Sequence, residues 1–249
     1  MAGLFPVIAG CMLVACAADK QPKTSSLTPD TRLQVAEAAE GAGERDLAVS
    51  MYITAASSAP REVKLQLRCA DALTRLGKIT QARDLLTERV KEMPEETDLT
   101  RALGLLYLVS GEPAQAVAEL DKLLTKKHQD VRVLVDKAVA LDLLHRHAEA
   151  QAIYRQVLTA SPNDPAVRND LALSLMLEGK IEEAREELAS TQDLDTSPER
   201  LKVNLGLLYA ATGEVDKSRQ LLGDRVSDSE LSTLTAAIKS PPAEQGTGH

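Results

Sequence analysis

The sequence predicts an all-α, right-handed superhelical solenoid, built from six helix–turn–helix repeats and closed by a C-terminal capping helix. Glycines recur every 34 residues, and small residues recur at two further positions of the same period. The chain is also 44% hydrophobic but only 2% aromatic, so its core consists mainly of Ala, Leu and Val and suits closely packed helices. A period of this length is typical of arrays in which each repeat is one helix pair.

The recurring glycines are expected to end the first helix of each repeat. They are Gly43, Gly77, Gly111, Gly179 and Gly213, and His145 occupies the remaining position of the series. A helix commonly ends in a left-handed residue, and glycine adopts that conformation at little cost. We therefore expect one irregular turn, at His145.

Two series of small residues are expected where the helices of a pair cross. Seven residues before each turn position lie Ala36, Ala70, Gly104, Ala138, Ala172 and Gly206. Five residues after it lie Ala48, Ala82, Ala116, Ala150, Ala184 and Ser218. Four residues further on, a larger side chain fills the space below the contact: Tyr52, Leu86, Leu120, Tyr154, Leu188 and Leu222. Close approach of two helices requires that no large side chain intervene.

Prolines indicate the other helix ends. Pro60, Pro94 and Pro162 are expected to end the second helix of their repeats. Three dipeptides are typical of an N-cap followed by a first-turn proline: Thr28-Pro29, Asp164-Pro165 and Ser197-Pro198.

This pattern of small residues, Tyr or Leu, and Pro resembles the tetratricopeptide repeat. The resemblance covers residues 29–232 as six repeats: 29–62, 63–96, 97–130, 131–164, 165–198 and 199–232. Repeats three, five and six depart from the pattern, because they carry His128, Thr196 and Glu230 where proline is expected. Leu231, Leu234 and Ile238 form an apolar stripe suited to a capping helix. Residues 233–249 are expected to hold the end of that helix and a disordered tail.

Composition and motifs argue against nucleic-acid binding and catalysis. The net charge is −8 and no block of Lys or Arg occurs, which disfavours phosphate or anionic-lipid binding. No phosphate loop, nucleophile elbow or metal-ligand cluster occurs, and the exposed pair His145 and His147 lacks a nearby Cys. Cys69 is expected to be a buried, inert thiol. We therefore expect no enzyme activity and no cofactor, metal or small-molecule substrate.

The N-terminus resembles a bacterial lipoprotein signal. An apolar run from Leu4 to Ala15 ends in Leu13-Val14-Ala15-Cys16, which is similar to the lipobox whose cysteine is acylated. The resemblance implies a signal peptide at 1–15, lipidation at Cys16 and a flexible tether at 16–28, and Ala17 after the cysteine implies the outer membrane. No Lys or Arg precedes the run, so two alternatives stay open: a start further upstream, or an ordinary buried helix. Cys11 fits the lipobox pattern less well.

The inner face of the superhelix is the expected partner-binding groove. Its candidate residues lie on the first helices of repeats three to six: Leu105, Leu108, Val135, Val139, Asn169, Leu173, Met176, Val203, Asn204 and Leu207. The first two repeats carry polar residues there, such as Glu37, Glu40, Asp71 and Thr74, so the groove changes from acidic to apolar. Asn169 and Asn204 are suited to bonding the backbone of an extended peptide. Packing between neighbouring helices explains the apolar residues equally well.

A short lipoprotein made of such repeats resembles the TadD family of the Tad (Flp) pilus machinery, on segments such as 168–173 and 203–207. That resemblance implies a scaffold on the periplasmic side of the outer membrane, which assists assembly of the pilus or its secretin. The pilotins of type IV pili are similar. A general periplasmic adaptor in envelope biogenesis and a cytosolic secretion chaperone are the alternatives. Each of these functions requires a protein partner.

Overall fold

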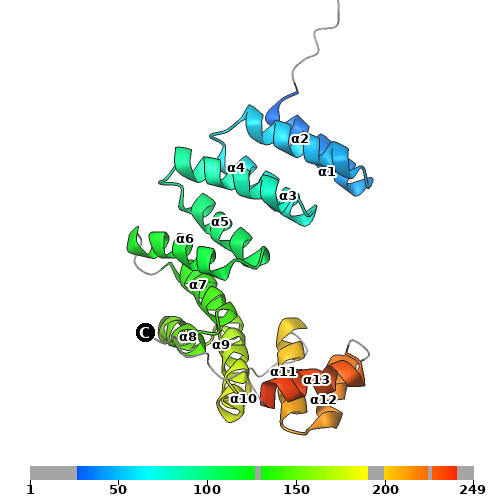
Figure 1. Ribbon diagram of the computed structural model, residues 1–249, viewed down its shortest axis with the longest axis vertical. Helices are drawn as coiled ribbons and strands as arrows, with labels where there is room; N and C mark the ends of the chain where they lie inside the picture. Colours follow the sequence, from blue (N-terminus) through cyan, green and yellow to red (C-terminus); the bar gives the residue numbers. More distant parts are fainter. Residues whose placement is uncertain (1–26, 127–129, 190–198, 224–225, 240–249) are drawn as a thin grey trace, which may run out of the picture.

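The computed structural model describes residues 27–126, 130–189, 199–223 and 226–239, and these ranges contain helices and turns but no strand. Six helix pairs follow one another: α1 (Pro29–Gly41) and α2 (Arg45–Ser58), α3 (Val63–Arg75) and α4 (Ile79–Glu92), α5 (Thr97–Val109) and α6 (Pro113–Lys126), α7 (Val131–Leu143) and α8 (His147–Ala160), α9 (Pro165–Leu177) and α10 (Ile181–Ala189), α11 (Glu199–Ala211) and α12 (Val215–Leu222). A last helix, α13 (Asp228–Lys239), packs against α11. Figure 1 shows the pairs stacked in chain order from blue to red, which confirms the predicted solenoid. The odd-numbered helices α1 to α11 are called A helices below, and the even-numbered ones B helices.

Each A helix ends in the same left-handed turn. The turn glycines have φ between +73° and +86°, and His145 adopts φ 59° in the same place. The next residue then donates its backbone N–H to a carbonyl five positions back, as from Glu112 to Tyr107 at 2.8 Å and from Arg146 to Leu141 at 2.9 Å. These hydrogen bonds satisfy carbonyls that the helix leaves unpaired. The turn at His145 therefore keeps the geometry of the others without glycine.

The predicted caps and proline stops are present. The Thr28 hydroxyl accepts the N–H of Thr31 at 3.2 Å, and the Asp164 carboxylate accepts the N–H of Ala166 at 2.9 Å. Pro60, Pro94 and Pro162 each lie two residues after the last residue of a B helix. The third expected cap, Ser197-Pro198, lies outside the described residues.

The small residues lie where the helices of each pair cross. The alanines of both series are at most 3% exposed, and the Tyr and Leu side chains below them are equally buried. A β-carbon placed on Gly206 would lie 2.6 Å from Cγ of Leu222, and one on Gly104 would lie 3.1 Å from Cγ of Leu120. The two glycines therefore allow a closer approach than alanine does.

The buried apolar residues form two main clusters rather than one. The first covers repeats one to three and the second covers repeats four to six, with a small cluster of Leu120, Leu123 and Val133 between them. Ion pairs bridge this junction: Arg101 lies 2.6 Å from Asp136, and Lys137 lies 2.6 Å from Asp121. Lys137 occupies the position at which the next two repeats bury Leu171 and Leu205.

Several expectations concern residues that the structure does not describe. The signal peptide at 1–15, Cys16, residues 16–26 of the tether, and 240–249 of the tail all lie outside the described ranges, as do the side chains of Leu234 and Ile238. Within the described part of the chain, none of the helices has the length and apolar character needed to cross a membrane. Cys69 is described, and it is buried with its thiol free. Burial raises the pKa of this thiol to about 11, so it is protonated and unreactive at neutral pH.

We predict that Gly206→Ala destabilises the fold more than Gly104→Ala. The new methyl group in Gly206→Ala overlaps Leu222, and overpacking of this kind costs about 1–3 kcal/mol. At Gly104 the contact is milder, and alanine regains about 0.5–1 kcal/mol of helix propensity. Urea unfolding of both variants measures the difference. Leu222→Ala should cost less in the Gly206→Ala background than in the wild type, and strictly additive costs would disprove the overlap.

We also predict that His145→Gly stabilises the chain, by less than about 1 kcal/mol. The left-handed conformation costs a side-chain-bearing residue about 1–2 kcal/mol, and the greater flexibility of glycine in the unfolded chain offsets part of that gain. Gly111→His is the reciprocal control and should lower the unfolding midpoint. Equal midpoints for His145→Gly and wild type would show that His145 makes contacts that compensate its strain.

Candidate functional site: the inner face of the superhelix

The A helices line the inner side of the superhelix because they pack against one another across repeats. Helix α3 contacts α5, α5 contacts α7, α7 contacts α9, and α9 contacts α11, whereas no two B helices are among the closely packed pairs of the described chain. Polar side chains bridge successive A helices, as in Arg101 to Asp136 and Asn204 to Asn169. The residues of the A helices that lie beside these bridges therefore form the inner face.

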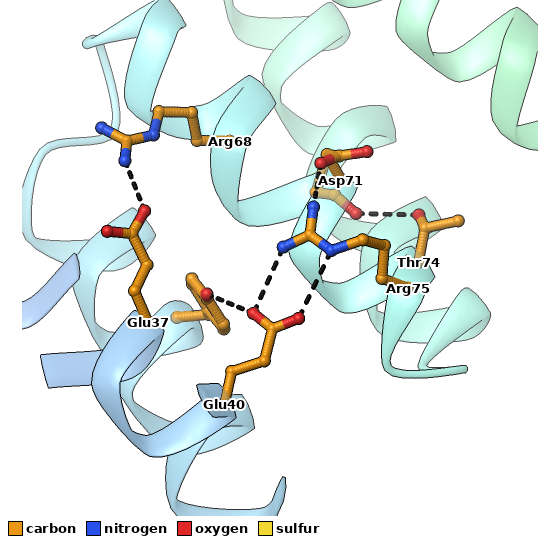
Figure 2. Close-up of polar contacts among 8 residues, drawn as sticks. Glu37, Glu40, Arg68, Asp71, Thr74 and Arg75 are labelled. Atoms are coloured by element: carbon orange, nitrogen blue, oxygen red, sulfur yellow. Dashed lines mark hydrogen bonds and ion pairs between the residues drawn. The ribbon is translucent and has the colours of Figure 1, made fainter. Parts of the chain in front are cut away.

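The acidic end of this face is paired internally. Figure 2 shows Glu37 of α1 bonded to Arg68 of α3, and the Arg75 guanidinium placed between Glu40 and Asp71. Arg75 donates to both oxygens of Glu40 at 3.3 and 3.2 Å. The acidic residues predicted here are thus present, but sequence reasoning missed the two arginines of repeat two that pair with them.

Glu40 also accepts a hydrogen bond from Tyr52 of its own repeat, at 2.6 Å. This bond, and then the bonds from Arg75, hold the pKa of Glu40 below its usual value. Burial, and then the neighbouring carboxylate, raise the pKa of Tyr52. The carboxylate therefore stays ionised and joins repeats one and two.

The predicted apolar residues lie on the inner face of repeats three to six, with one exception. Seven of them are half-buried: Leu105, Leu108, Val135, Val139, Leu173, Val203 and Leu207. Met176 is 1% exposed and belongs to the core of the second cluster, so it supports this surface from below.

Sequence reasoning missed the most exposed apolar residues of this surface. Val109, Leu143 and Leu177 are the last residues of α5, α7 and α9, and they are 66%, 52% and 43% exposed. They are 34 residues apart, so the repeat itself was the signal that could have revealed them. Each follows a half-buried apolar residue by four positions, which places the two on one side of the helix.

Asn169 and Asn204 are turned toward each other rather than toward solvent. They are 2% and 8% exposed, and the Asn204 amide donates to Oδ1 of Asn169 at 3.1 Å. The pair joins α9 to α11. In this arrangement the two amides hold the repeats together and are not presented to a ligand.

A largely buried carboxylate joins repeats four and five. Asp142 of α7 accepts hydrogen bonds from Ser174 of α9 at 2.6 Å and from Tyr154 of α8 at 3.2 Å, and His147 Nδ1 lies 2.8 Å from it. Burial raises the pKa of Asp142, although these hydrogen bonds oppose the shift. The Ser174 hydroxyl donates to the carboxylate and not to the histidine, so this group lacks the nucleophile–base contact of a hydrolase.

His145 and His147 are not an exposed pair. His147 is buried against Asp142, and its ring lies edge-to-face with that of His145 at 5.9 Å between centroids. Within the described ranges, no three His, Cys, Asp or Glu side chains are grouped so that they could hold a metal ion.

Comparison with known proteins finds tetratricopeptide repeats in the middle of the chain. Residues 101–165 and 144–200 match two family models, both described as tetratricopeptide repeat. An uncharacterized protein of Sinorhizobium fredii, y4yS, is 34% identical over 111 residues, which are 45% of this chain and 60% of that protein. The TPR repeat-containing thioredoxin TTL4 of Arabidopsis thaliana is 36% identical over 76 residues, which are 30% of this chain and 11% of that protein. The chain thus spans less than two thirds of either relative.

Two solved structures share the fold. A tetratricopeptide repeat protein from Parabacteroides merdae aligns with a TM-score of 0.70 and 18% identity, over 87% of this chain and 86% of that one. PilW, described as a widely conserved type IV pilus biogenesis factor, aligns with a TM-score of 0.64 and 19% identity, over 83% and 97%. At these identities the likeness establishes the fold alone. Tetratricopeptide repeats indicate a scaffold for protein interactions, a class that is generally non-catalytic.

We predict that the two carboxyl groups that bond a tyrosine, Asp142 and Glu40, make the stability of the fold depend on pH in opposite directions. The folded-state pKa of Asp142 is raised, so the folded chain binds this proton more tightly and loses stability as pH rises from about 4 through that pKa. The pKa of Glu40 is lowered, so its contribution is present above about pH 4 and is lost as pH falls through its folded pKa.

Asp142→Asn should therefore gain stability relative to wild type as pH rises, and Glu40→Gln should lose it. The free energy of unfolding of the wild type and both variants is measured in urea from about pH 3.5 to about pH 7, a range that begins near the unfolded-state pKa values of Asp and Glu. The slope of the difference between each variant and the wild type against pH tests each assignment. Parallel curves for the two variants would contradict the assignment.

Proposed function

We propose that this tetratricopeptide-repeat protein is a non-catalytic scaffold, anchored by lipid at the periplasmic face of the outer membrane, that assists assembly of a Tad (Flp) pilus or its secretin. The observation that carries the scaffold role is the series of exposed apolar side chains, Val109, Leu143 and Leu177, on the inner face of three consecutive repeats. Exposed apolar surface in a regular array is typical of protein-binding sites.

The membrane anchor rests on the sequence before the repeats. Leu13-Val14-Ala15-Cys16 resembles a lipobox, and acyl chains on Cys16 would hold the protein at the membrane because each buried methylene contributes about 0.8 kcal/mol. The first helix starts at Pro29, so residues 16–28 would separate the lipid from the repeats.

A role in assembling a type IV pilus, as for a pilotin, is the second candidate. PilW has this fold and is described as a type IV pilus biogenesis factor, which favours this role. Both candidates require the same anchored scaffold, and they differ only in the partner.

We predict that Cys16→Ser abolishes both lipid labelling and membrane association. Cells of the native host expressing either form are labelled with a fatty-acid analogue and fractionated. Cys11→Ser is the matched control and should leave label and fractionation unchanged. Survival of both signals in Cys16→Ser would contradict lipidation at that residue.

The partner is identified by crosslinking within the intact envelope. A photo-crosslinking residue in place of Val109 or Leu143 should capture a secretin or another pilus component, whereas the same residue in place of Val215 should not. Val215 is comparably exposed, but it starts a B helix and lies off the inner face. Capture of a protein unrelated to pili would overturn the pilus role and leave the scaffold role standing.

A further inference from the structure

The inner face carries an apolar stripe that is limited to three repeats. We define the apolar stripe as Leu105 and Val109, Val139 and Leu143, and Leu173 and Leu177. In repeat two the same two positions hold Asp71 and Arg75, and in repeat six they hold Leu207 and the buried Ala211. The stripe therefore has a charged boundary at repeat two, and it ends at repeat six because Ala211 is buried there.

The polar groups beside the stripe are already bonded to one another. Asn169 bonds Asn204 across α9 and α11, and Asp136 pairs with Arg101 across α7 and α5. Asp142 accepts from Ser174 and Tyr154, and His147 Nδ1 lies 2.8 Å from it. A segment that binds over the stripe would therefore have to compete with these bonds for hydrogen-bond partners for its backbone.

This requirement discriminates between conformations of the partner. An extended segment presents free N–H and C=O groups, and burying them unpaired costs free energy. A helix satisfies these groups internally and presents only side chains. The surface therefore favours a helix, although the sequence alone suggested that the two asparagines grip an extended peptide.

The charged boundary adds a second requirement. The single guanidinium of Arg75 bonds two carboxylates, Glu40 and Asp71, while Glu37 has its own arginine, Arg68. This group of residues thus carries one excess negative charge, and the Asp71 side chain is well exposed. A cationic residue at the adjoining end of the partner would complement it.

We propose that the apolar stripe binds an amphipathic α-helix of a protein partner, with a Lys or Arg of that helix placed over Asp71. The proposal rests on the proposed scaffold function and names the kind of segment that the scaffold recognises. Leu or similar residues repeated at i, i+3, i+4 and i+7 in the partner would contact Val109, Leu143 and Leu177.

A panel of three synthetic peptides tests the proposal on the full-length protein. The first is an amphipathic peptide of about five helical turns with leucines at helical spacing and two lysines at one end. The second has the same residues with a central leucine replaced by proline, which breaks the helix. The third carries two glutamates in place of the lysines. Fluorescence anisotropy gives the affinity, and circular dichroism gives the helix content gained on binding.

We expect the first peptide to bind and to gain helix, and the proline peptide to bind at least about tenfold more weakly. Leu143→Glu with Leu177→Glu should weaken binding of the first peptide to a similar extent, whereas the control Val215→Glu should not. Asp71→Lys should reverse the preference between the lysine and glutamate peptides. All four substituted side chains are exposed, so thermal unfolding should show intact folds.

The alternative outcomes overturn the proposal. Equal binding of the proline peptide, binding without gain of helix, or binding that Leu143→Glu with Leu177→Glu leaves unchanged would each show that the stripe does not recognise a helix. Failure of all three peptides to bind would do the same. Such a failure with positive crosslinks at Val109 and Leu143 would leave the scaffold function intact. Absence of those crosslinks would count against the scaffold function itself.

Discussion

Every repeat depends on one contact, the crossing of its two helices at a pair of small residues. Ala36 with Ala48, and their equivalents along the chain, bring the backbones so close that a single larger side chain must lie just below the crossing. At Gly206 the approach is so close that even a methyl group overlaps Leu222. This contact fixes the angle within each pair, and stacking of similar pairs then fixes which side of every A helix faces inward. The binding surface is therefore a consequence of packing at residues that no partner touches.

The helices and turns could be predicted from sequence because they follow local rules that recur with the repeat. Proline stops, caps and left-handed turns each act within a few residues, and the turn at His145 forms because its neighbours make the same hydrogen bonds as elsewhere. The exposure of inner-face residues could not be predicted in the same way. Met176 is buried and its neighbour Leu177 is exposed, although both are apolar and adjacent, because one residue turns the side chain by about 100° around the helix. The rotation relative to the next repeat decides such cases.

Pairing between repeats was also hidden from sequence. Glu37 and Arg68, or Asn169 and Asn204, lie 31 and 35 residues apart, and any A helix offers several partners at such distances. One signal was nevertheless present: the two repeats that carry Tyr instead of Leu below the crossing, at Tyr52 and Tyr154, also carry an acid twelve residues earlier, at Glu40 and Asp142. The hydroxyl group requires a hydrogen-bond partner when it is buried, and the carboxylate supplies it. The two carboxyl groups nevertheless differ in pKa. Hydrogen bonds from Tyr52 and Arg75 lower the pKa of Glu40, whereas deeper burial raises the pKa of Asp142.

The division of the inner face into a charged and an apolar part separates two tasks. Exposed ion pairs contribute about 0–1 kcal/mol each, so Glu37, Asp71 and their arginines add little to stability and can rearrange at small cost. Full burial of an exposed Leu side chain gains about 1.5–3 kcal/mol, and because Leu143 is 52% exposed, covering it would gain about half of that. Affinity for a partner would therefore come from repeats three to five, whereas the charged repeats would govern orientation and discriminate against partners with an acidic end. Two partly buried ion pairs at the junction of repeats three and four, Arg101 with Asp136 and Lys137 with Asp121, fix how the first two parts of the apolar stripe meet. That junction therefore determines whether one straight helix can contact Val109 of repeat three and Leu143 of repeat four at the same time.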